Sequence, residues 1–335
     1  MSNLKKILID KKNCKSLWFM RQAGRYLPEF RKIRSQNQNF INLCLNSELS
    51  SEITLQPIDR FDIDSAIIFS DILMVPYALG QEIKFVKEQG PQLSTFNLNQ
   101  FLSNDKILFS QKLHPIYKAI EITRKKLDKK KSLIGFVGAP WTLLIYMLGA
   151  KMGKKKIDYN KINSKEFEVN VILDKLNEYL CVHIENQISA GANVIQIFDS
   201  WAGLLCKNDL PNYCYIPNLK IVEFCKNKKI PVICFPRGIN KNYKEFNNLV
   251  KPNGLNLDYE IDPTWSKQNL KNVVLQGGLD PKVLFLPDKE IKINTIKYLN
   301  IFKDVPYIFN LGHGLLPETD PNKLEEIIKI YRNYN

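Results

Sequence analysis

The sequence lacks most features that mark membrane, secreted or zinc-binding proteins. No apolar run is long enough to cross a bilayer, and the N-terminus has neither the apolar core nor the small-residue cleavage site of a signal peptide. The seven cysteines are an odd number, are widely spaced and include no C-x-x-C pair. This usage disfavours a disulfide framework and fits a reducing compartment. We therefore expect a cytoplasmic protein with no membrane partner and no structural zinc site.

Signatures of cofactor and nucleic-acid binding are also missing. There is no G-x-G-x-x-G, P-loop, nucleophile elbow or H-E-x-x-H, so no flavin, nicotinamide or metal site is predicted. Of only three histidines, His114 and His183 fall in or near helical patterns and are interpreted as bystanders. The formal net charge of +14 comes mainly from lysines scattered along the chain. Without a zinc-finger or RNA-binding motif, we expect no nucleic-acid partner, and the charge would favour an anionic small molecule.

What the chain does contain is an alternation of short apolar runs with longer amphipathic segments, which indicates an α/β fold with a parallel sheet. We expect strands at 65–70, 133–137, 193–198, 230–235, 254–258, 272–276 and 306–311, with 17–20 as a candidate eighth. Helical patterns fall at 165–189, 214–227, 241–251 and 321–333. The predicted architecture is a single (β/α)8 (TIM) barrel domain over residues 1–335, in preference to a doubly wound sheet. It has an N-terminal extension and an insertion at 72–131, where 81–92 predicts a small excursion of strands.

One stretch, Trp18–Arg34, concentrates arginine in a chain that otherwise uses lysine. Its arginines are Arg21, Arg25, Arg31 and Arg34. Gly24 and Pro28 favour a loop before the following helix. Arginine is preferred over lysine where a planar, bidentate group binds carboxylate or phosphate. The stretch therefore predicts a site for an anion with several such groups, and a solvated basic surface is the alternative.

Polar and glycine-rich residues directly follow the predicted strands, where barrel active sites are built. They are Arg21, Asp71, Gly138–Thr142, Tyr146, Asp199–Gly203, Pro236–Gly238, Asp258, Gly277–Pro281 and Gly312–Pro317. Facing the arginine-rich loop, Asp71 is a candidate for charge stabilisation, and a helix N-cap is the alternative. His313 lies between two glycines that allow a ligand to approach the backbone closely, and a structural turn is equally open.

Five blocks of sequence resemble the uroporphyrinogen decarboxylase family, in the family's order. They are Trp18–Arg34, Ala66–Leu73, Gly135–Thr142, Phe198–Gly203 and Asn310–Gly314. The resemblance implies a homodimeric (β/α)8 barrel that acts in haem and porphyrin biosynthesis. Such an enzyme removes the four acetate carboxyls of uroporphyrinogen III as CO2 and leaves the methyls of coproporphyrinogen III. The resemblance also implies that no metal or organic cofactor is required.

The same resemblance implies a catalytic pair, Asp71 and Arg21. Asp71 matches the family aspartate that faces the pyrrole N–H groups, and its charge would stabilise a pyrrole protonated on a ring carbon. Arg21, Arg25 and Arg34 match family arginines that engage substrate carboxylates, and Arg21 is also a candidate proton donor.

Four further positions are implied as substrate contacts. Tyr146, Ser200 and His313 match side chains that hold the substrate, and Phe198 matches one that packs on it. Two other functions stay open. A zinc- or corrinoid-linked methyltransferase of the same superfamily would need a His/Cys metal site, and His313 has no nearby cysteine in sequence. A non-catalytic homologue would bind a tetrapyrrole or RNA without releasing CO2.

Overall fold

The computed structural model describes residues 1–12, 14–86, 90–153, 156–162 and 169–334. Its main sheet is parallel throughout, in the spatial order β1-β4-β7-β8-β9-β10-β11. The strands are β1 (Ser65–Ile67), β4 (Ser132–Gly138), β7 (Val194–Asp199), β8 (Val232–Pro236), β9 (Gly254–Leu257), β10 (Val274–Gly277) and β11 (Tyr307–Ile308). All seven predicted strands are therefore confirmed, although their ends are shifted.

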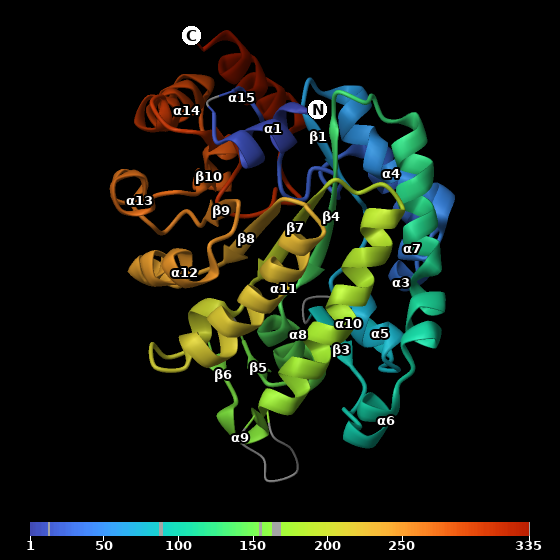
Figure 1. The fold of residues 1–335 in the computed structure, drawn as a ribbon. Coiled ribbons are helices and arrows are strands. Elements are labelled where there is room, and N and C mark those ends of the chain that lie inside the picture. Colours follow the sequence, from blue (N-terminus) through green and yellow to red (C-terminus); the bar gives the residue numbers. More distant parts are fainter. Residues whose placement is uncertain (13, 87–89, 154–155, 163–168, 335) are drawn as a thin grey trace.

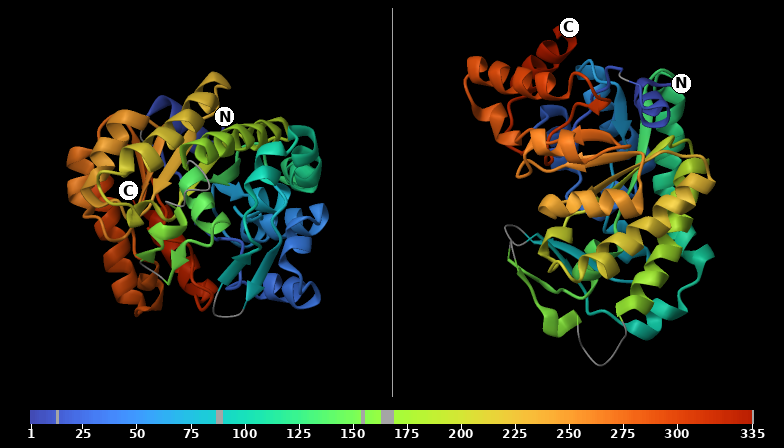
Figure 2. Two further views of the ribbon diagram at one scale, coloured as in Figure 1. Left: turned by 90° about the horizontal axis from the view of Figure 1, so that it is seen from below. Right: turned by 60° about the vertical axis from the view of Figure 1, so that its left-hand side comes forward.

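The sheet closes on itself through the segment around Leu17, which lies between β11 and β1. Leu17 forms a parallel bridge with Phe309, and the Trp18 N–H donates to the Phe309 carbonyl at 3.3 Å. On the other side, the Leu17 carbonyl accepts from the N–H of Asp64, the residue before β1, at 2.9 Å. The candidate eighth strand is thus a short closing segment. The predicted α/β barrel is confirmed, with helices surrounding the strands (Figure 2).

The barrel interior is filled by side chains. An apolar cluster joins inward-pointing strand residues to three residues of α1 (Asn3–Asp10), and α1 closes the N-terminal end of the barrel. Its members are Leu4, Ile7, Leu8, Trp18, Met20, Ile67, Ile134, Val194, Ile233, Phe235, Val274 and Ile308. A buried polar layer accompanies it, in which Trp18 Nε1 donates to Gln276 Oε1 at 2.9 Å and Gln276 Nε2 donates to Asn256 Oδ1 at 2.7 Å. Ligands must therefore enter from the C-terminal ends of the strands.

Helices cover the outside of the barrel and bury a second, larger apolar core against it. They are α2 (Pro28–Gln36), α3 (Phe40–Cys44), α4 (Ser47–Arg60), α7 (Lys106–Lys126), α10 (Val169–Ser189), α11 (Ile216–Asn227), α12 (Tyr243–Val250), α13 (Pro263–Asn269), α14 (Asp288–Phe302) and α15 (Pro321–Asn333). The helical patterns predicted at 214–227, 241–251 and 321–333 are confirmed. The pattern at 165–189 is confirmed from Val169 onward, and its first residues lie outside the described part of the chain.

Two antiparallel hairpins and several short helices extend the C-terminal end of the barrel (Figure 1). The hairpins are β2 (Ile83–Val86) with β3 (Gly90–Leu93), and β5 (Lys151–Met152) with β6 (Lys156–Ile157). The helices are α5 (Met74–Ala78), α6 (Leu98–Ser103), α8 (Pro140–Met147) and α9 (Tyr159–Ile162). The first hairpin confirms the excursion predicted within 81–92, although residues 87–89 are not described. The second was not predicted, because its lysine-rich sequence shows no alternation of apolar residues.

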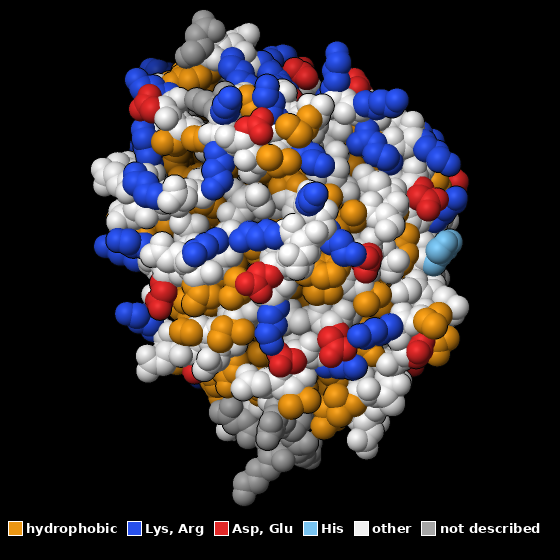
Figure 3. Space-filling model, viewed as in Figure 1, with side chains coloured by type: hydrophobic (Ala, Val, Ile, Leu, Met, Phe, Trp, Pro, Cys, Tyr) orange, Lys and Arg blue, Asp and Glu red, His pale blue; other side chains and the backbone are white. Residues whose placement is uncertain are grey.

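The surface carries the scattered charge that the composition indicates. Lysine and arginine are spread over the face shown in Figure 3, with aspartate and glutamate among them. In the described residues, no helix has the length and apolar character needed to cross a membrane. All seven cysteines are free thiols.

Candidate active site

The arginine-rich stretch forms a tight loop whose first functional residue, Arg21, has an unusual backbone conformation. Its φ of 60° is left-handed, which residues other than glycine rarely adopt. Neighbouring segments hold it there. The Met20 N–H donates to Asn310 Oδ1 at 3.1 Å, and the Leu315 N–H donates to the Met20 carbonyl at 2.9 Å. The special conformation thus belongs to Arg21 and not to Gly24, whose φ lies outside this region. Strain of this kind clusters at functional sites.

Two other side chains of the stretch hold the loop in place. Gln22 is buried; its Oε1 accepts from the Phe19 N–H at 3.0 Å and its Nε2 donates to the Ser65 carbonyl at 2.9 Å. Arg31 Nη1 donates to the carbonyls of Arg25 at 3.0 Å and of Tyr26 at 2.9 Å. Arg31 is therefore a structural arginine. The other arginines differ from it in having no such role in the loop.

Asp71 lies in the loop after β1 and is not the N-cap of α5, because that position is Leu73. Its Oδ1 accepts from the Leu73 N–H at 2.8 Å, which supports the turn before α5. Burial is the main influence on its pKa and raises it, whereas the Leu73 N–H and the charge of Arg21 lower it. Within the described residues, no ion pair joins Asp71 to a cation at 4 Å or less. The carboxylate therefore keeps an acceptor for a ligand.

Arg21 is the electrostatic centre of the site. Its side chain is reached by solvent, yet surrounding protein lowers its pKa, with desolvation as the largest cause. The charges of Arg25 and Arg237 lower the pKa further, and Asp71 and Tyr146 oppose that change. Residues from the N-terminal loop, the β1 loop, α8 and the end of β8 therefore surround one space.

His313 faces the same group of charges from the loop after β11. Burial lowers the pKa of its imidazole to about 4, and the charges of Arg21 and Arg237 add to this effect. Its Nδ1 lies 3.3 Å from the Gly314 carbonyl. At neutral pH the ring is therefore uncharged, so it offers one N–H donor and one acceptor and not a positive charge.

Gly314 leaves room for the Arg21 side chain. A Cβ at this position would lie 2.4 Å from Arg21 Cδ and 2.7 Å from Arg21 Cγ. We expect Gly314→Ala to displace the guanidinium and to lower kcat/KM by up to about 10²-fold, because catalytic groups tolerate little misplacement. Steady-state kinetics with the proposed substrate below measures this effect. An unchanged kcat/KM in a folded variant would show that the position of Arg21 is not critical.

The two remaining predicted arginines, Arg25 and Arg34, differ in their surroundings. Arg25 is exposed, and its charge reaches Arg21. Arg34 is half-buried; its Nη1 donates to the Asn37 carbonyl, and its Cζ lies 5.8 Å from the centroid of the Phe40 ring. The structure thus brings Arg25 close to the central group, whereas one N–H of Arg34 is already bound to the end of its own helix.

The end of β7 supplies an aromatic floor and a hydroxyl. Phe198 packs against the interior cluster, and its ring meets that of Phe136 edge-on at 5.7 Å. Ser200 directly follows the last residue of β7, Asp199, and lies in the turn after the strand. The residue between them, Asp199, is buried and accepts from Thr142 Oγ1 at 2.7 Å and from Asn218 Nδ2 at 3.1 Å. Burial raises the Asp199 pKa to about 6, and its role is structural.

Tyr146 reaches the site from α8. Its ring packs edge-on against Trp201 with centroids 5.9 Å apart, and burial raises its pKa. Lys151, from the β5–β6 hairpin that was not predicted, lies over Trp201, with its Nζ 4.4 Å from the centroid of the Trp201 ring. The tyrosine is therefore a neutral hydroxyl held in place by aromatic packing.

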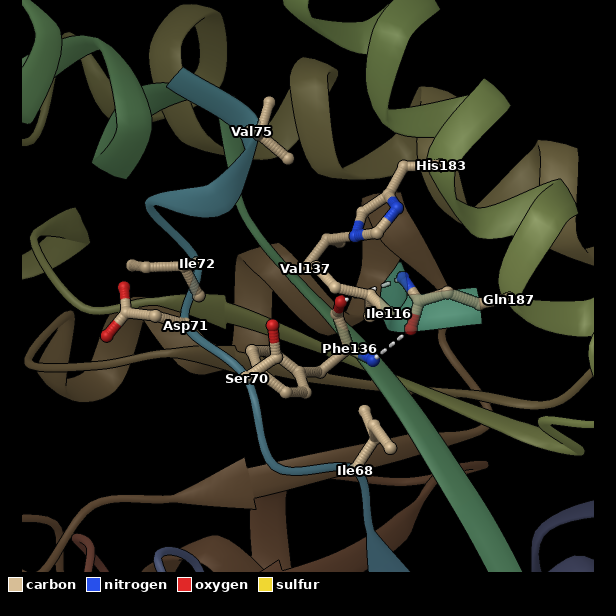
Figure 4. Close-up of a pocket in the computed structure, with 10 residues that line it drawn as sticks. All are labelled: Ile68, Ser70, Asp71, Ile72, Val75, Ile116, Phe136, Val137, His183 and Gln187. Carbon is tan, nitrogen blue, oxygen red and sulfur yellow. Dashed lines mark hydrogen bonds between the residues drawn. The ribbon is translucent and has the colours of Figure 1, made fainter. Parts of the chain in front are cut away.

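A small internal pocket lies behind the Asp71 loop, between β4, α7 and α10 (Figure 4). The Asp71 carboxylate points away from His183 and Gln187, which line the other side. His183 Nδ1 lies 3.0 Å from the Tyr117 hydroxyl, and burial lowers its pKa to about 3. This histidine has a structural contact, in keeping with its interpretation as a bystander. In the part of the chain that the structure describes, no three His, Cys, Asp or Glu side chains could together hold a metal ion.

Sequence reasoning missed three contributors to the site. Arg237 follows a predicted strand but was not singled out, and Asn310 and Gly314 were noted only as parts of a motif. A signal existed for each, because all three lie within or next to the polar segments that follow strands. The roles of Asn310 and Gly314 depend on contacts with Met20 and Arg21, which lie some three hundred residues earlier in the chain.

The chain is similar to known proteins over nearly its whole length. Residues 13–334 match the family described as "Uroporphyrinogen decarboxylase (URO-D)". A uroporphyrinogen decarboxylase from Orientia tsutsugamushi (strain Ikeda) is 40% identical, over 97% of this chain and 96% of that protein. A uroporphyrinogen decarboxylase from Rickettsia bellii (strain RML369-C) is also 40% identical, over 95% of this chain and 94% of that protein. Among solved structures, a methyltransferase from Methanosarcina mazei has a TM-score of 0.76 at 15% identity, covering 98% of this chain and 97% of that one. At this low identity the last likeness shows the fold alone.

Proposed function

Because the chain belongs to the uroporphyrinogen decarboxylase family, we infer that it is a carboxy-lyase of haem and porphyrin biosynthesis. It removes the carboxyls of the four acetate side chains of uroporphyrinogen III and yields coproporphyrinogen III and CO2. The observation that carries this conclusion is the family match over residues 13–334. The arrangement of arginines around one carboxylate at the mouth of the barrel supports it.

Decarboxylation of an acetate side chain requires an electron acceptor. When an acetate loses CO2, the electrons of the broken C–C bond must move into an acceptor. A pyrrole that has taken a proton on a ring carbon is such an acceptor. A second proton then adds to the exocyclic carbon and completes the methyl group, and the ring carbon releases its proton so that the pyrrole is restored. The protonated pyrrole is a cation, so a fixed carboxylate beside it lowers the barrier. Asp71 is proposed for this role, since its desolvated carboxylate has no ion-pair partner at close range in the described residues.

Arg21 is proposed as the second catalytic residue. Its guanidinium lies in the field of Asp71 and would bind the reacting carboxylate or donate the proton to the pyrrole. The lowering of its pKa makes proton donation by Arg21 easier. Guanidinium is nevertheless a very weak acid, so proton donation by an arginine is chemically difficult. Arg25 and Arg34 are proposed to bind other carboxylates of the macrocycle, where a planar guanidinium can form two parallel hydrogen bonds.

Four uncharged side chains complete the proposed site. The hydroxyls of Tyr146 and Ser200 and the neutral imidazole of His313 would hydrogen-bond to the substrate. Phe198 would pack against the macrocycle, as its place on the barrel floor suggests. We further propose a single-domain, homodimeric, cytoplasmic enzyme that requires no cofactor and binds no nucleic acid. Light scattering that finds a monomer at working concentrations would contradict the dimer.

The anaerobic reaction with uroporphyrinogen III tests the function directly. Purified protein, treated with a chelator, is incubated with the substrate, and products are separated by chromatography according to their number of carboxyl groups. Stepwise loss of carboxyls that ends at coproporphyrinogen III is the expected result. Binding without conversion would favour the non-catalytic alternative, and activity that depends on added zinc and a methyl donor would favour the methyltransferase.

A further inference from the structure

Arg237 continues the row of β8 side chains that point into the barrel. Ile233 and Phe235 belong to the interior cluster, and side chains two apart on a strand share a face. The Arg237 N–H donates to the Asp199 carbonyl at 3.1 Å. This bond belongs to the last pair of the β7–β8 ladder, Asp199 with Pro236, so the backbone hydrogen bonding of the ladder reaches Arg237. The side chain of Arg237 therefore leaves the backbone on the inner side, at the end where the site lies.

The backbone around Arg237 is firmly held. Its carbonyl accepts from the Gly203 N–H at 2.9 Å, and the next residue, Gly238, donates its N–H to Asp258 Oδ2 at 2.8 Å. Gly203 and Gly238 pack so closely that a Cβ on Gly203 would lie 2.6 Å from the carbonyl carbon of Gly238. Such a position suits a side chain that must be held ready for a ligand.

Arg237 and Arg21 stand on opposite walls of the barrel. Around the closed sheet, β8 is four places from the Leu17 segment in both directions, through β1, β4 and β7 or through β11, β10 and β9. The two arginines are nevertheless close enough for the charge of Arg237 to lower the pKa of Arg21 and that of His313. Both guanidinium groups therefore border the same space.

The guanidinium of Arg237 lacks a counter-charge within the described part of the chain. It is half-buried, and among the described residues no ion pair or side-chain hydrogen bond engages it. The Asp258 carboxylate nearby already accepts four hydrogen bonds. Their donors are the N–H groups of Gly238, Glu260 and Ile261 and the hydroxyl of Tyr243. Removing a cation from water without a partner is costly, and an anionic ligand in the shared space would offset that cost.

We propose that Arg237 is a further substrate-binding residue, which holds a carboxylate of the porphyrinogen on the wall opposite Arg21. This inference rests on the proposed function. Uroporphyrinogen carries an acetate and a propionate on each pyrrole, so a macrocycle at the mouth of the barrel presents carboxylates to both walls. Arg21 would engage the side where CO2 is lost, and Arg237 would fix the far side and so orient the ring. The group that it holds is an acetate or a propionate.

Kinetics and binding of Arg237→Gln, Arg237→Lys and Lys241→Gln test this role. Lys241 is an exposed residue four positions further on, so its variant controls for the loss of one positive charge. We expect Arg237→Gln to raise KM about 10- to 100-fold, as for the loss of a hydrogen bond between charged groups. Arg237→Lys should recover part of the loss, and Lys241→Gln should resemble the unmodified protein. The Tm of Arg237→Gln should stay the same or rise, because the removed cation has no partner among the residues that the structure describes.

Two comparisons make the outcomes distinct. A propionate contact predicts the same rise in KM for uroporphyrinogen and for the pentacarboxylate intermediate, whereas an acetate contact predicts a smaller rise for the pentacarboxylate. Quenching of tryptophan fluorescence by uroporphyrinogen reports binding independently of CO2 release. If the unmodified protein binds but releases no CO2, the proposed function fails, and a weaker Kd in Arg237→Gln still supports the binding role. An unchanged KM and Kd in Arg237→Gln would overturn the proposal, as would a KM rise equally large in Lys241→Gln.

Discussion

Replacing Asp71 by asparagine is expected to lower kcat by about 10²- to 10³-fold, the usual effect of removing one preorganised electrostatic group. The amide keeps the size of the side chain, and its oxygen can still accept from the Leu73 N–H that supports the turn. What disappears is the negative charge beside the protonated pyrrole. Because that cation forms only during the reaction, kcat should fall while KM changes little.

The same substitution should not destabilise the protein at neutral pH. Burial raises the pKa of Asp71 in the folded state above its ordinary value, so the folded protein binds this proton more tightly than the unfolded chain. The resulting stabilisation is fully present below the unfolded pKa and is lost as pH rises through the folded pKa. At neutral pH the ionised carboxylate therefore costs stability, and Asp71→Asn should keep or raise Tm. Such an exchange of stability for activity is common at catalytic sites.

A matched control is Asp59→Asn, which removes an exposed carboxylate from α4. It should leave both kcat and Tm near those of the unmodified protein. The assay is the anaerobic conversion of uroporphyrinogen III, and Tm is followed by circular dichroism. Near-normal turnover in Asp71→Asn would remove Asp71 from the mechanism, and a large fall in Tm would mean that the lost activity reports misfolding.

The strands could be predicted from sequence because burial on both faces leaves continuous apolar runs, but their ends could not. The run at 65–70 is an example, since β1 ends at Ile67. The Phe69 N–H donates to Thr54 Oγ1 at 2.8 Å, and the Phe69 carbonyl accepts from Ser50 Oγ at 2.7 Å. These two side chains of α4 engage the backbone that would otherwise continue the ladder. No local sequence pattern reveals these two hydrogen bonds, because they depend on how α4 packs against the strand.

In the candidate site, too, some features could be predicted from the sequence and others could not. Arginine enrichment predicted the anion-binding loop, and the polar residue that follows an apolar run predicted Asp71, because composition and apolar runs are visible in sequence. The left-handed backbone of Arg21 and the room that Gly314 leaves for it were not visible, since both arise from contacts between the two ends of the chain. Arg237 was overlooked for a related reason. The proposed role of Arg237 depends on the closure of the barrel, which brings β8 opposite the Leu17 segment.

Replacing Arg21 by glutamine is expected to lower kcat/KM by about 10²-fold or more, because a charged group that contacts both carboxylate and transition state is lost. The pH profile gives a sharper result. Activity requires ionised Asp71, so kcat/KM should fall as pH drops through the raised pKa of that carboxyl. The charge of Arg21 lowers this pKa. Its removal should therefore move the acid limb of the profile to higher pH.

Arg21→Lys separates the charge of Arg21 from its shape. Lysine keeps the positive charge near Asp71, so the acid limb should stay close to its original pH. It cannot reproduce two parallel hydrogen bonds to a carboxylate, so KM should still rise. Both profiles are measured anaerobically with uroporphyrinogen III over the pH range in which each variant keeps its circular dichroism spectrum. An acid limb that does not move in Arg21→Gln would show that the titrating group is not Asp71, or that Arg21 does not set its pKa. An equal shift in Arg21→Lys would assign the effect to guanidinium geometry instead of charge, and the proposed electrostatic coupling of the pair would be wrong.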